Sequence, residues 1–169
     1  MPPTRDLILA LILALCATPG GAQTISDKAR RDEVVKVPQD DPDMAAAMRN
    51  ARATLPNFLA LARATPPSTT GFSVKVAVSD GSLTEYFWVV QFEGKSGQYS
   101  GRVNNRPRTV HNVTFGQVIT FPESDIVDWT YLEGKKMKGG YTTCAIMKRE
   151  PRDEASAFAR QFPGFAPAC

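Results

Sequence analysis

Residues 71–92, GFSVKVAVSDGSLTEYFWVVQF, decide the fold class. In the first half, apolar residues alternate with Ser73 and Lys75, which is the period of a half-buried β-strand. The segment SDGS at 79–82 is typical of a tight turn. A second strand follows over residues 84–92, and its two faces are both apolar, which indicates a central strand. One face carries Tyr86, Trp88, Val90 and Phe92, and the other carries Phe87 and Val89.

Further short strands are expected on the C-terminal side of this hairpin. The pattern predicts them over residues 98–103, with a bulge at Gly101, and over 108–115, 117–121 and 141–147, the last introduced by Gly139 and Gly140. No strand alternates with a helix, which argues against a parallel nucleotide-binding sheet. The sequence therefore predicts an antiparallel, strongly curved sheet that can form a partly open barrel.

Helices are expected before and after the sheet. Asp41 is a good N-cap and Pro42 suits the first helical position, so a helix begins there. Pro56 is expected to end or kink that helix, and Thr54 to cap a second short one. A C-terminal helix is expected over residues 153–161. The fold class is α+β, with N-terminal helices packed on the sheet.

The N-terminus has the pattern of an export signal. The apolar run over residues 7–16 is shorter than the about 20 residues of a membrane-spanning helix, but it fits a signal-peptide core. Small residues at Gly20 and Ala22 predict cleavage after Ala22. A buried core helix and lipoprotein processing at Cys16 are the alternatives. We therefore expect a periplasmic or secreted protein with no transmembrane segment in its mature chain.

These patterns divide the chain into four parts. Residues 1–22 are the signal peptide, and residues 23–40, polar and mixed in charge, are a flexible linker. Residues 41–150 form the α+β domain, and residues 151–169 are a C-terminal helical extension.

The cysteines point to one disulfide bond. Cleavage would remove Cys16 and leave Cys144 and Cys169, and two cysteines in an oxidising compartment favour a bridge. Such a bridge would stabilise the fold by about 3 kcal/mol. Two free thiols are the alternative, and no Cys-x-x-Cys redox motif is present.

The strand region also contains an ordered set of short motifs. They are Phe72-Ser73-Val74-Lys75, Glu85 with Trp88, Gly101 with Asn105 and Pro107, Gly116 followed by Val118 and Phe121, Ile126-Val127-Asp128-Trp129, and Gly139-Gly140-Tyr141-Thr142, preceded by Asp43-Met44 and residues 51–55. In this order they resemble the YegJ-like family of bacterial domains of unknown function (DUF2314), over residues 41–148. The resemblance implies a bacterial protein, and it brings no activity or site residues with it.

The residues that could support catalysis are few, and no catalytic residue is assigned. Asp125 and Asp128 are paired carboxylates beside the aromatic Trp129, a combination found in glycan-processing sites, and His111 is the single histidine. The alternative places Asp125 in a turn, Asp128 as an acceptor of backbone hydrogen bonds, and His111 on the surface. No zinc set, phosphate-binding loop or dinucleotide fingerprint is present, so no metal or cofactor is expected.

Two groups of residues are candidates for binding. Tyr86, Trp88, Tyr99 and Arg102 would form an aromatic and basic surface on the sheet. Lys135, Lys136 and Lys138 form a basic hairpin tip, and Arg102, Arg106 and Arg108 form a second basic group. If the sheet brings these two groups together, they could bind an anionic surface such as lipid head groups or an acidic partner. A solvated turn is the alternative for the lysines. The formal net charge of +3, from 20 basic and 17 acidic residues, argues against a nucleic-acid partner.

The sequence therefore favours a periplasmic binding domain without catalysis, whose partner is an envelope protein or a cell-wall component. A small cell-envelope hydrolase acting on glycan or peptide is one alternative. An inhibitor of a secreted toxin or enzyme is another.

Overall fold

The computed structural model describes residues 41–149 as an α+β fold with an antiparallel sheet. The elements are α2 (Pro42–Ala64), β1 (Thr69–Asp80), β2 (Leu83–Lys95), β3 (Gln98–Val103), β4 (Val118–Pro122), the short 3-10 helix η1 (Glu123–Asp125), β5 (Ile126–Glu133), β6 (Lys136–Gly139) and α3 (Tyr141–Met147). The predicted signal peptide, linker and C-terminal helix lie outside the described residues.

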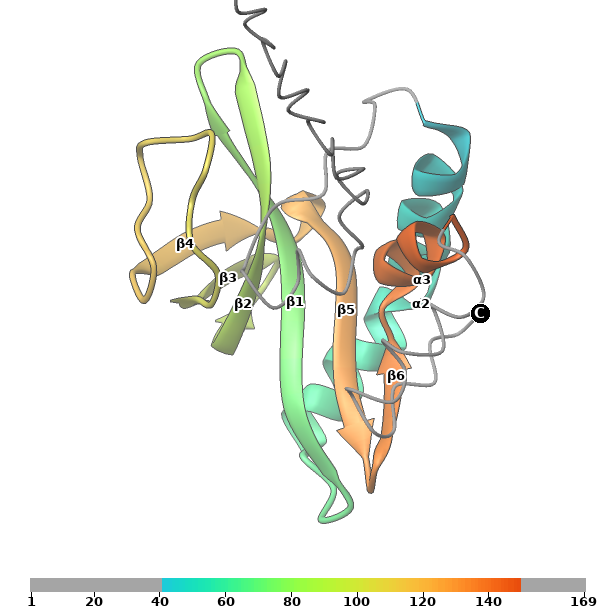
Figure 1. Cartoon of the computed structure of the whole chain (residues 1–169). Helices are drawn as coiled ribbons and strands as arrows, with labels where there is room; N and C mark the ends of the chain where they lie inside the picture. The colour runs from blue at the N-terminus through green and yellow to red at the C-terminus, as the bar shows by residue number, and fades with distance from the viewer. Residues whose placement is uncertain (1–40, 150–169) are drawn as a thin grey trace, which may run out of the picture.

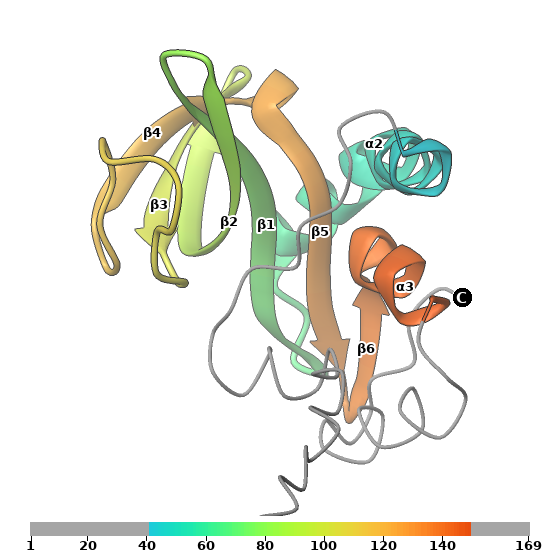
Figure 2. The same ribbon diagram turned by 45° about the horizontal axis from the view of Figure 1, so that its top comes forward.

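The sheet has the strand order β4-β3-β2-β1-β5-β6, and all neighbouring strands are antiparallel. It is strongly curved, and β4 arcs back toward the start of β5, to which η1 connects it (Figure 2). β4 and β6 are the edge strands, so the sheet does not close into a barrel. The predicted fold class is confirmed.

Within residues 41–149, one helix rather than two precedes the sheet. Asp41 caps α2 as expected, because its carboxylate accepts the backbone N–H of Met44 at 2.8 Å. The predicted break at Pro56 is wrong, since α2 continues through it for 23 residues. The Trp129 indole donates to the carbonyl of Ala51 at 3.0 Å, next to the carbonyl of Arg52, which Pro56 deprives of its usual N–H partner. Packing against the sheet therefore holds the helix together across the proline.

The core lies between α2 and one face of the sheet, which we call the inner face. The ring of Phe58, on α2, stacks on Trp129 of β5 with centroids 4.8 Å apart and contacts Phe72 and Phe92 at 5.9 Å. Val74, Val76, Phe87 and Val89 are fully buried on the same face. In Figure 1, α2 passes behind the sheet, so the opposite, outer face is turned toward the viewer.

A bulge in β2 changes which residues face the core. Gln91 has a φ of 49°, and Gln91 and Phe92 together stand opposite Gly101 of β3. The extra residue turns Phe92 to the inner face, so its predicted place beside Trp88 is wrong. A Cβ on Gly101 would lie 2.6 Å from Val89 Cγ1, which explains why the bulge faces a glycine.

Two predicted strands are not strands. Residues 108–115 belong to a loop between β3 and β4, and Tyr141–Met147 is α3. The sequence analysis also missed two real strands, β5 and β6. Tertiary hydrogen bonds to Glu85 and Asp128, described below, are the reason that residues 108–115 and 141–147 are not strands.

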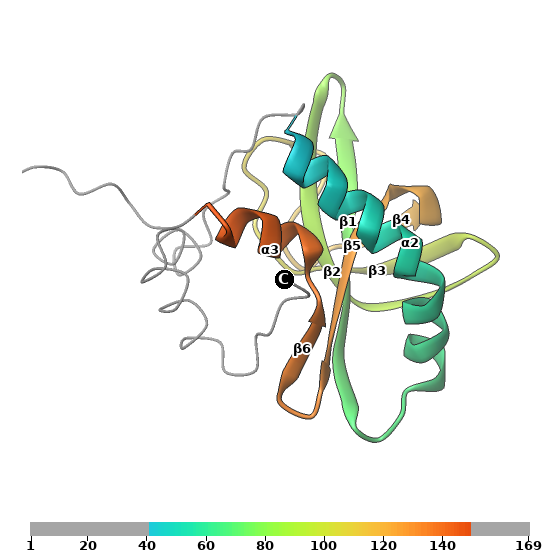
Figure 3. The ribbon, with the colours of Figure 1, turned by 90° about the vertical axis from the view of Figure 1, so that its right-hand side faces the viewer.

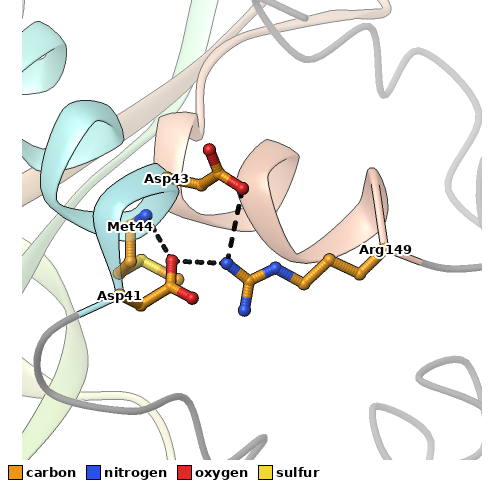
Figure 4. A network of polar contacts seen from close by, with 4 residues as sticks. All are labelled: Asp41, Asp43, Met44 and Arg149. Carbon is orange, nitrogen blue, oxygen red and sulfur yellow. Dashed lines mark hydrogen bonds and ion pairs between the residues drawn. The ribbon is translucent and has the colours of Figure 1, made fainter.

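α3 packs against both α2 and β5. Figure 3 shows α3 at the end of β6, beside the start of α2. Just after α3, the guanidinium of Arg149 bonds to the Asp41 carboxylate and lies 3.7 Å from that of Asp43 (Figure 4). This ion pair joins the end of α3 to the start of α2.

Candidate functional site

The outer face of the sheet carries a continuous row of side chains. The register pairs Val118 with Arg102, Arg102 with Val90, Val90 with Ser73, and Ser73 with Thr130, and direct partners share a face. The next row contains Trp88, Lys75 and Asp128, and the row after it contains Tyr86 and Ala77. We call these three rows the outer-face surface.

Three of the four predicted surface residues lie on this face. Tyr86 is 39% exposed, Arg102 is exposed, and Trp88 is half-buried. Tyr99 is on the inner face, where it is only 5% exposed and stacks on Phe121. Burial raises the pKa of Tyr99. The hydrogen bond that its hydroxyl donates to Glu123 at 3.0 Å is the second largest cause of this increase. Tyr99 is therefore part of the core rather than of the surface.

Exposed apolar side chains border Arg102. Val118, its register partner, is 56% exposed, and Phe115, on the β3–β4 loop, is 57% exposed. The Arg102 guanidinium donates to the carbonyl of Gly116, next to Phe115, and to the side chain of Gln91. Arg106 lies over the Phe115 ring at 5.8 Å. The loop thus extends the outer-face surface beyond the sheet.

The β3–β4 loop is held by one buried carboxylate. Glu85, on β2, is 4% exposed and accepts three consecutive backbone N–H groups, those of Arg108, Thr109 and Val110, at 2.8–3.2 Å. These N–H groups converge on Glu85, so they cannot pair with a neighbouring strand. This is why residues 108–115 do not form the predicted strand.

Asn105 and Asp80 add two further anchors to this loop. Asn105 accepts the N–H of Trp88 at 2.8 Å, and Asp80 accepts the N–H of His111 at 2.9 Å. The loop is therefore tied along its length to the β1–β2 hairpin.

Asp128 anchors α3 to β5. It is fully buried, and its two oxygens accept four hydrogen bonds, from the backbone N–H groups of Trp129, Tyr141 and Thr142 and from the Thr142 hydroxyl, at 2.6–3.2 Å. A register shift in β5 beside Lys75 and Val76 places this carboxylate at the start of α3. The alternative interpretation, in which Asp128 accepts backbone hydrogen bonds, is confirmed.

Lys75 lies beside Asp128 on the outer-face surface. Its ammonium donates to the Thr142 hydroxyl at 2.9 Å and lies 5.1 Å from the centroid of the Trp88 ring. Burial lowers the pKa of Lys75, and the charge of Asp128 opposes this effect only in part. The sequence analysis missed Lys75 and Thr142 because a lysine on the polar side of an alternating strand looks like an ordinary surface residue.

The catalytic candidates do not form one constellation. Asp125, on η1, lines a groove of about 350 Å³ between β1 and β4, and Asn112 lines the same groove. His111 is exposed on the β3–β4 loop, whereas Asp128 is buried beside Lys75 and Thr142. Asp128 thus stands apart from the groove that Asp125 lines.

The two predicted basic groups lie apart. Lys136 and Lys138 belong to β6, at the opposite edge of the sheet from β4, and three strands, β2, β1 and β5, lie between β6 and Arg102 on β3. Lys138 forms an ion pair with Glu133 at 3.3 Å, and Lys135 is exposed in the β5–β6 turn. The lysines therefore do not extend the outer-face surface.

Cys144 is buried on α3 and takes part in a disulfide bond. Its partner lies outside residues 41–149, so the pairing with Cys169 stays a prediction. Within residues 41–149, no group of three or more His, Cys, Asp or Glu side chains is arranged to hold a metal ion. In the same part of the chain, no helix is long and apolar enough to cross a membrane.

Comparison with known proteins identifies the class. The family described as "Uncharacterized protein conserved in bacteria (DUF2314)" matches residues 41–165, which contain the whole described fold. The chain belongs to this family, as the motifs indicated.

Two known bacterial proteins are similar in sequence to this chain. The chain is 31% identical over 148 residues to "Uncharacterized protein YegJ" of Escherichia coli (strain K12), covering 88% of this chain and 92% of that protein. It is 32% identical over 83 residues to "Putative ankyrin repeat protein NMB1133/NMB1171" of Neisseria meningitidis serogroup B (strain ATCC BAA-335 / MC58), covering 46% of this chain and 32% of that protein. No solved structure matches.

Proposed function

We propose that this chain is an exported binding domain of the bacterial cell envelope, without catalysis, and that it contacts an envelope protein or a cell-wall component through its outer-face surface. The export signal read at residues 1–22 supports the location. The outer-face surface supports the mode of action.

The main support for this proposal is that exposed apolar side chains are concentrated on the outer-face surface and the adjoining loop. Four large hydrophobic residues are exposed among residues 41–149, and three of them, Tyr86, Phe115 and Val118, belong to the outer-face surface and its adjoining loop. Arg102 and the half-buried Trp88 lie among them. Aromatic residues and arginine are the residue types enriched in protein interfaces, and a patch of this kind marks an interaction site.

The rigidity of the surface also favours binding. The strands supply Tyr86, Trp88 and Arg102, and Glu85 and Asn105 fix the loop beside them. A surface held in place before contact loses little conformational freedom when a partner binds.

The hydrolase alternative gains no support from the geometry of the carboxylates. A general acid or base must reach the substrate, but Asp128 is fully buried and all four of its acceptor positions are occupied. Asp128 instead acts as the capping group of α3.

The test is a cross-linking pull-down from an envelope extract, with the chain from Gln23 onward as bait. The double variant Y86S/R102S should lose an enriched partner that the unchanged chain retains. R49S, which removes an exposed arginine on α2, is the matched control and should retain it. Retention of the partner by Y86S/R102S would contradict the proposed surface. Enrichment of a secreted enzyme whose activity falls on binding would define the domain as an inhibitor.

A further inference from the structure

The strongest unexplained feature of the outer-face surface is the environment of Lys75. A lysine ammonium has three N–H donors, and within residues 41–149 one hydrogen bond is found for it, to the Thr142 hydroxyl at 2.9 Å. The Thr142 hydroxyl in turn donates its own hydrogen bond to the Asp128 carboxylate, at 2.6 Å. Lys75 is therefore held in position with donor capacity left over.

Asp128 does not neutralise Lys75 directly. Its four acceptor positions are filled by Trp129, Tyr141 and Thr142, so the Thr142 hydroxyl, and not a direct hydrogen bond, links the carboxylate to the ammonium. Burial makes the charged form of an amine with this incomplete pairing unfavourable, which agrees with the lowered pKa of Lys75.

The charges around Lys75 are unbalanced on the outer-face surface. Its three rows contain two cations, Lys75 and Arg102, and one carboxylate, the buried Asp128. The groups that face Lys75 are Trp88 from β2, Asp128 from β5 and Thr142 from α3. A ligand that supplies an acceptor and a negative charge beside Trp88 would therefore complete the site.

We propose that Lys75 binds a carboxylate of the partner, so that the outer-face surface recognises an acidic protein segment, with Trp88 as the adjoining aromatic platform. This inference rests on the proposed function and names its partner chemistry. The carboxylate makes the direct charge-assisted hydrogen bond to Lys75 that Asp128 cannot make. Arg102 and the exposed ring of Tyr86 contact the neighbouring residues of the segment.

The experiment uses a hexaglutamate peptide and, as its neutral counterpart, a hexaglutamine peptide. Binding is followed by NMR of the Trp88 indole and of the lysine side chains of the unchanged protein. We expect hexaglutamate to bind at least about tenfold more tightly than hexaglutamine and to raise the pKa of Lys75, since a nearby carboxylate favours the charged amine. The preference should weaken as salt is added.

Two variants separate Lys75 from general charge. K75M keeps most of the buried stem but removes the amine, and it should lose the preference for hexaglutamate. K136M removes an exposed lysine of β6 and should keep it. If K75M does not fold, the pKa of Lys75 in the unchanged protein still decides the question.

Two results would overturn the inference. Equal binding of both peptides at Trp88 would show that the surface binds without selecting carboxylates, which leaves the binding domain standing. No response of Lys75 or Trp88 to hexaglutamate would also reject the carboxylate site. The pull-down with Y86S/R102S tests the surface independently of either result.

Discussion

Glu85 shows how a single side chain determines a whole loop. Its carboxylate is buried and accepts hydrogen bonds from the backbone N–H groups of Arg108, Thr109 and Val110. The loop in turn presents Phe115 beside Arg102. The shape of the outer-face surface therefore depends on a residue that faces away from it.

We predict that E85Q destabilises the protein. The amide removes the charge and turns an N–H donor toward other N–H donors, so the free energy of unfolding should fall by about 2–3 kcal/mol. Urea unfolding measures this loss, and amide exchange at residues 108–110 should become faster. E93Q, at an exposed glutamate of the same strand, should change stability by less than about 0.5 kcal/mol. A stable E85Q with protected amides would contradict this role.

Asp41 should make the free energy of unfolding depend on pH in the acidic range. The hydrogen bond from Arg149, and then that from the Met44 N–H, hold the pKa of Asp41 below its usual value of 3.8. A depressed carboxyl pKa stabilises the folded state above the unfolded pKa, and that stabilisation is lost as pH falls through the folded pKa. The D41N variant lacks this contribution. Its stability deficit relative to the unchanged protein should be constant near neutral pH and should shrink below about pH 4. Urea midpoints at several pH values measure the deficit, and a deficit that does not change in acid would contradict the assignment.

At the scale of elements, the β6–α3 junction fixes the position of α3. Gly139 and Gly140 both have positive φ, and the N–H of Gly140 donates to the Trp129 carbonyl at 2.9 Å. A Cβ on Gly139 would lie 2.0 Å from that carbonyl oxygen. The turn therefore needs a glycine for space as well as for conformation.

We predict that G139A lowers the free energy of unfolding by about 3 kcal/mol or more, from the combined cost of a backbone clash and a left-handed alanine. G134A is the matched control. Its φ is +58°, with no atom within 4 Å of the added methyl group, so it should cost about 1 kcal/mol. Thermal or urea unfolding compares the two. Equal losses would show that the close approach to Trp129 does not matter.

The elements that could be predicted from the sequence are those with local signals. Asp41 and Pro42 mark the start of α2, and the alternation in residues 72–78 marks β1. The Ser79–Ser82 turn and the short β3 and β4 strands also follow local rules.

The elements that the sequence analysis missed depend on distant partners. Tyr141–Met147 has a strand-like composition, but Asp128, 13 residues earlier, binds its first N–H groups and makes it a helix. Glu85 converts residues 108–115 into a loop in the same way. Within the candidate site, Tyr86, Trp88 and Arg102 could be predicted, whereas Lys75 and Thr142 depend on the pairing of β1 with β5.

At the scale of the whole molecule, the two faces of the sheet have different roles. α2 covers the inner face and forms the core with it, and the outer face carries the residues proposed for binding. Because Tyr86 and Arg102 are exposed on the outer face, we expect substitutions there to leave the fold intact, so mutagenesis can test the proposal.

The proposed export predicts a defined N-terminus. When the full chain is expressed in a bacterium, the protein recovered from the periplasm should begin at Gln23, since Gly20 and Ala22 occupy the positions that signal peptidase requires. Mass spectrometry of that fraction measures this directly. Full-length protein confined to the cytoplasm would contradict the export proposal, and a lipid-modified Cys16 would replace it with membrane anchoring.

The most direct test of the central claim is site-specific photo-crosslinking in the cell envelope. A benzoylphenylalanine placed at position 86, on the outer-face surface, should form a discrete cross-linked product with one partner. The same group at position 57, on the exposed side of α2, should form none. A product from position 57 that is absent at position 86 would contradict the claim that this domain binds through the outer face of its sheet.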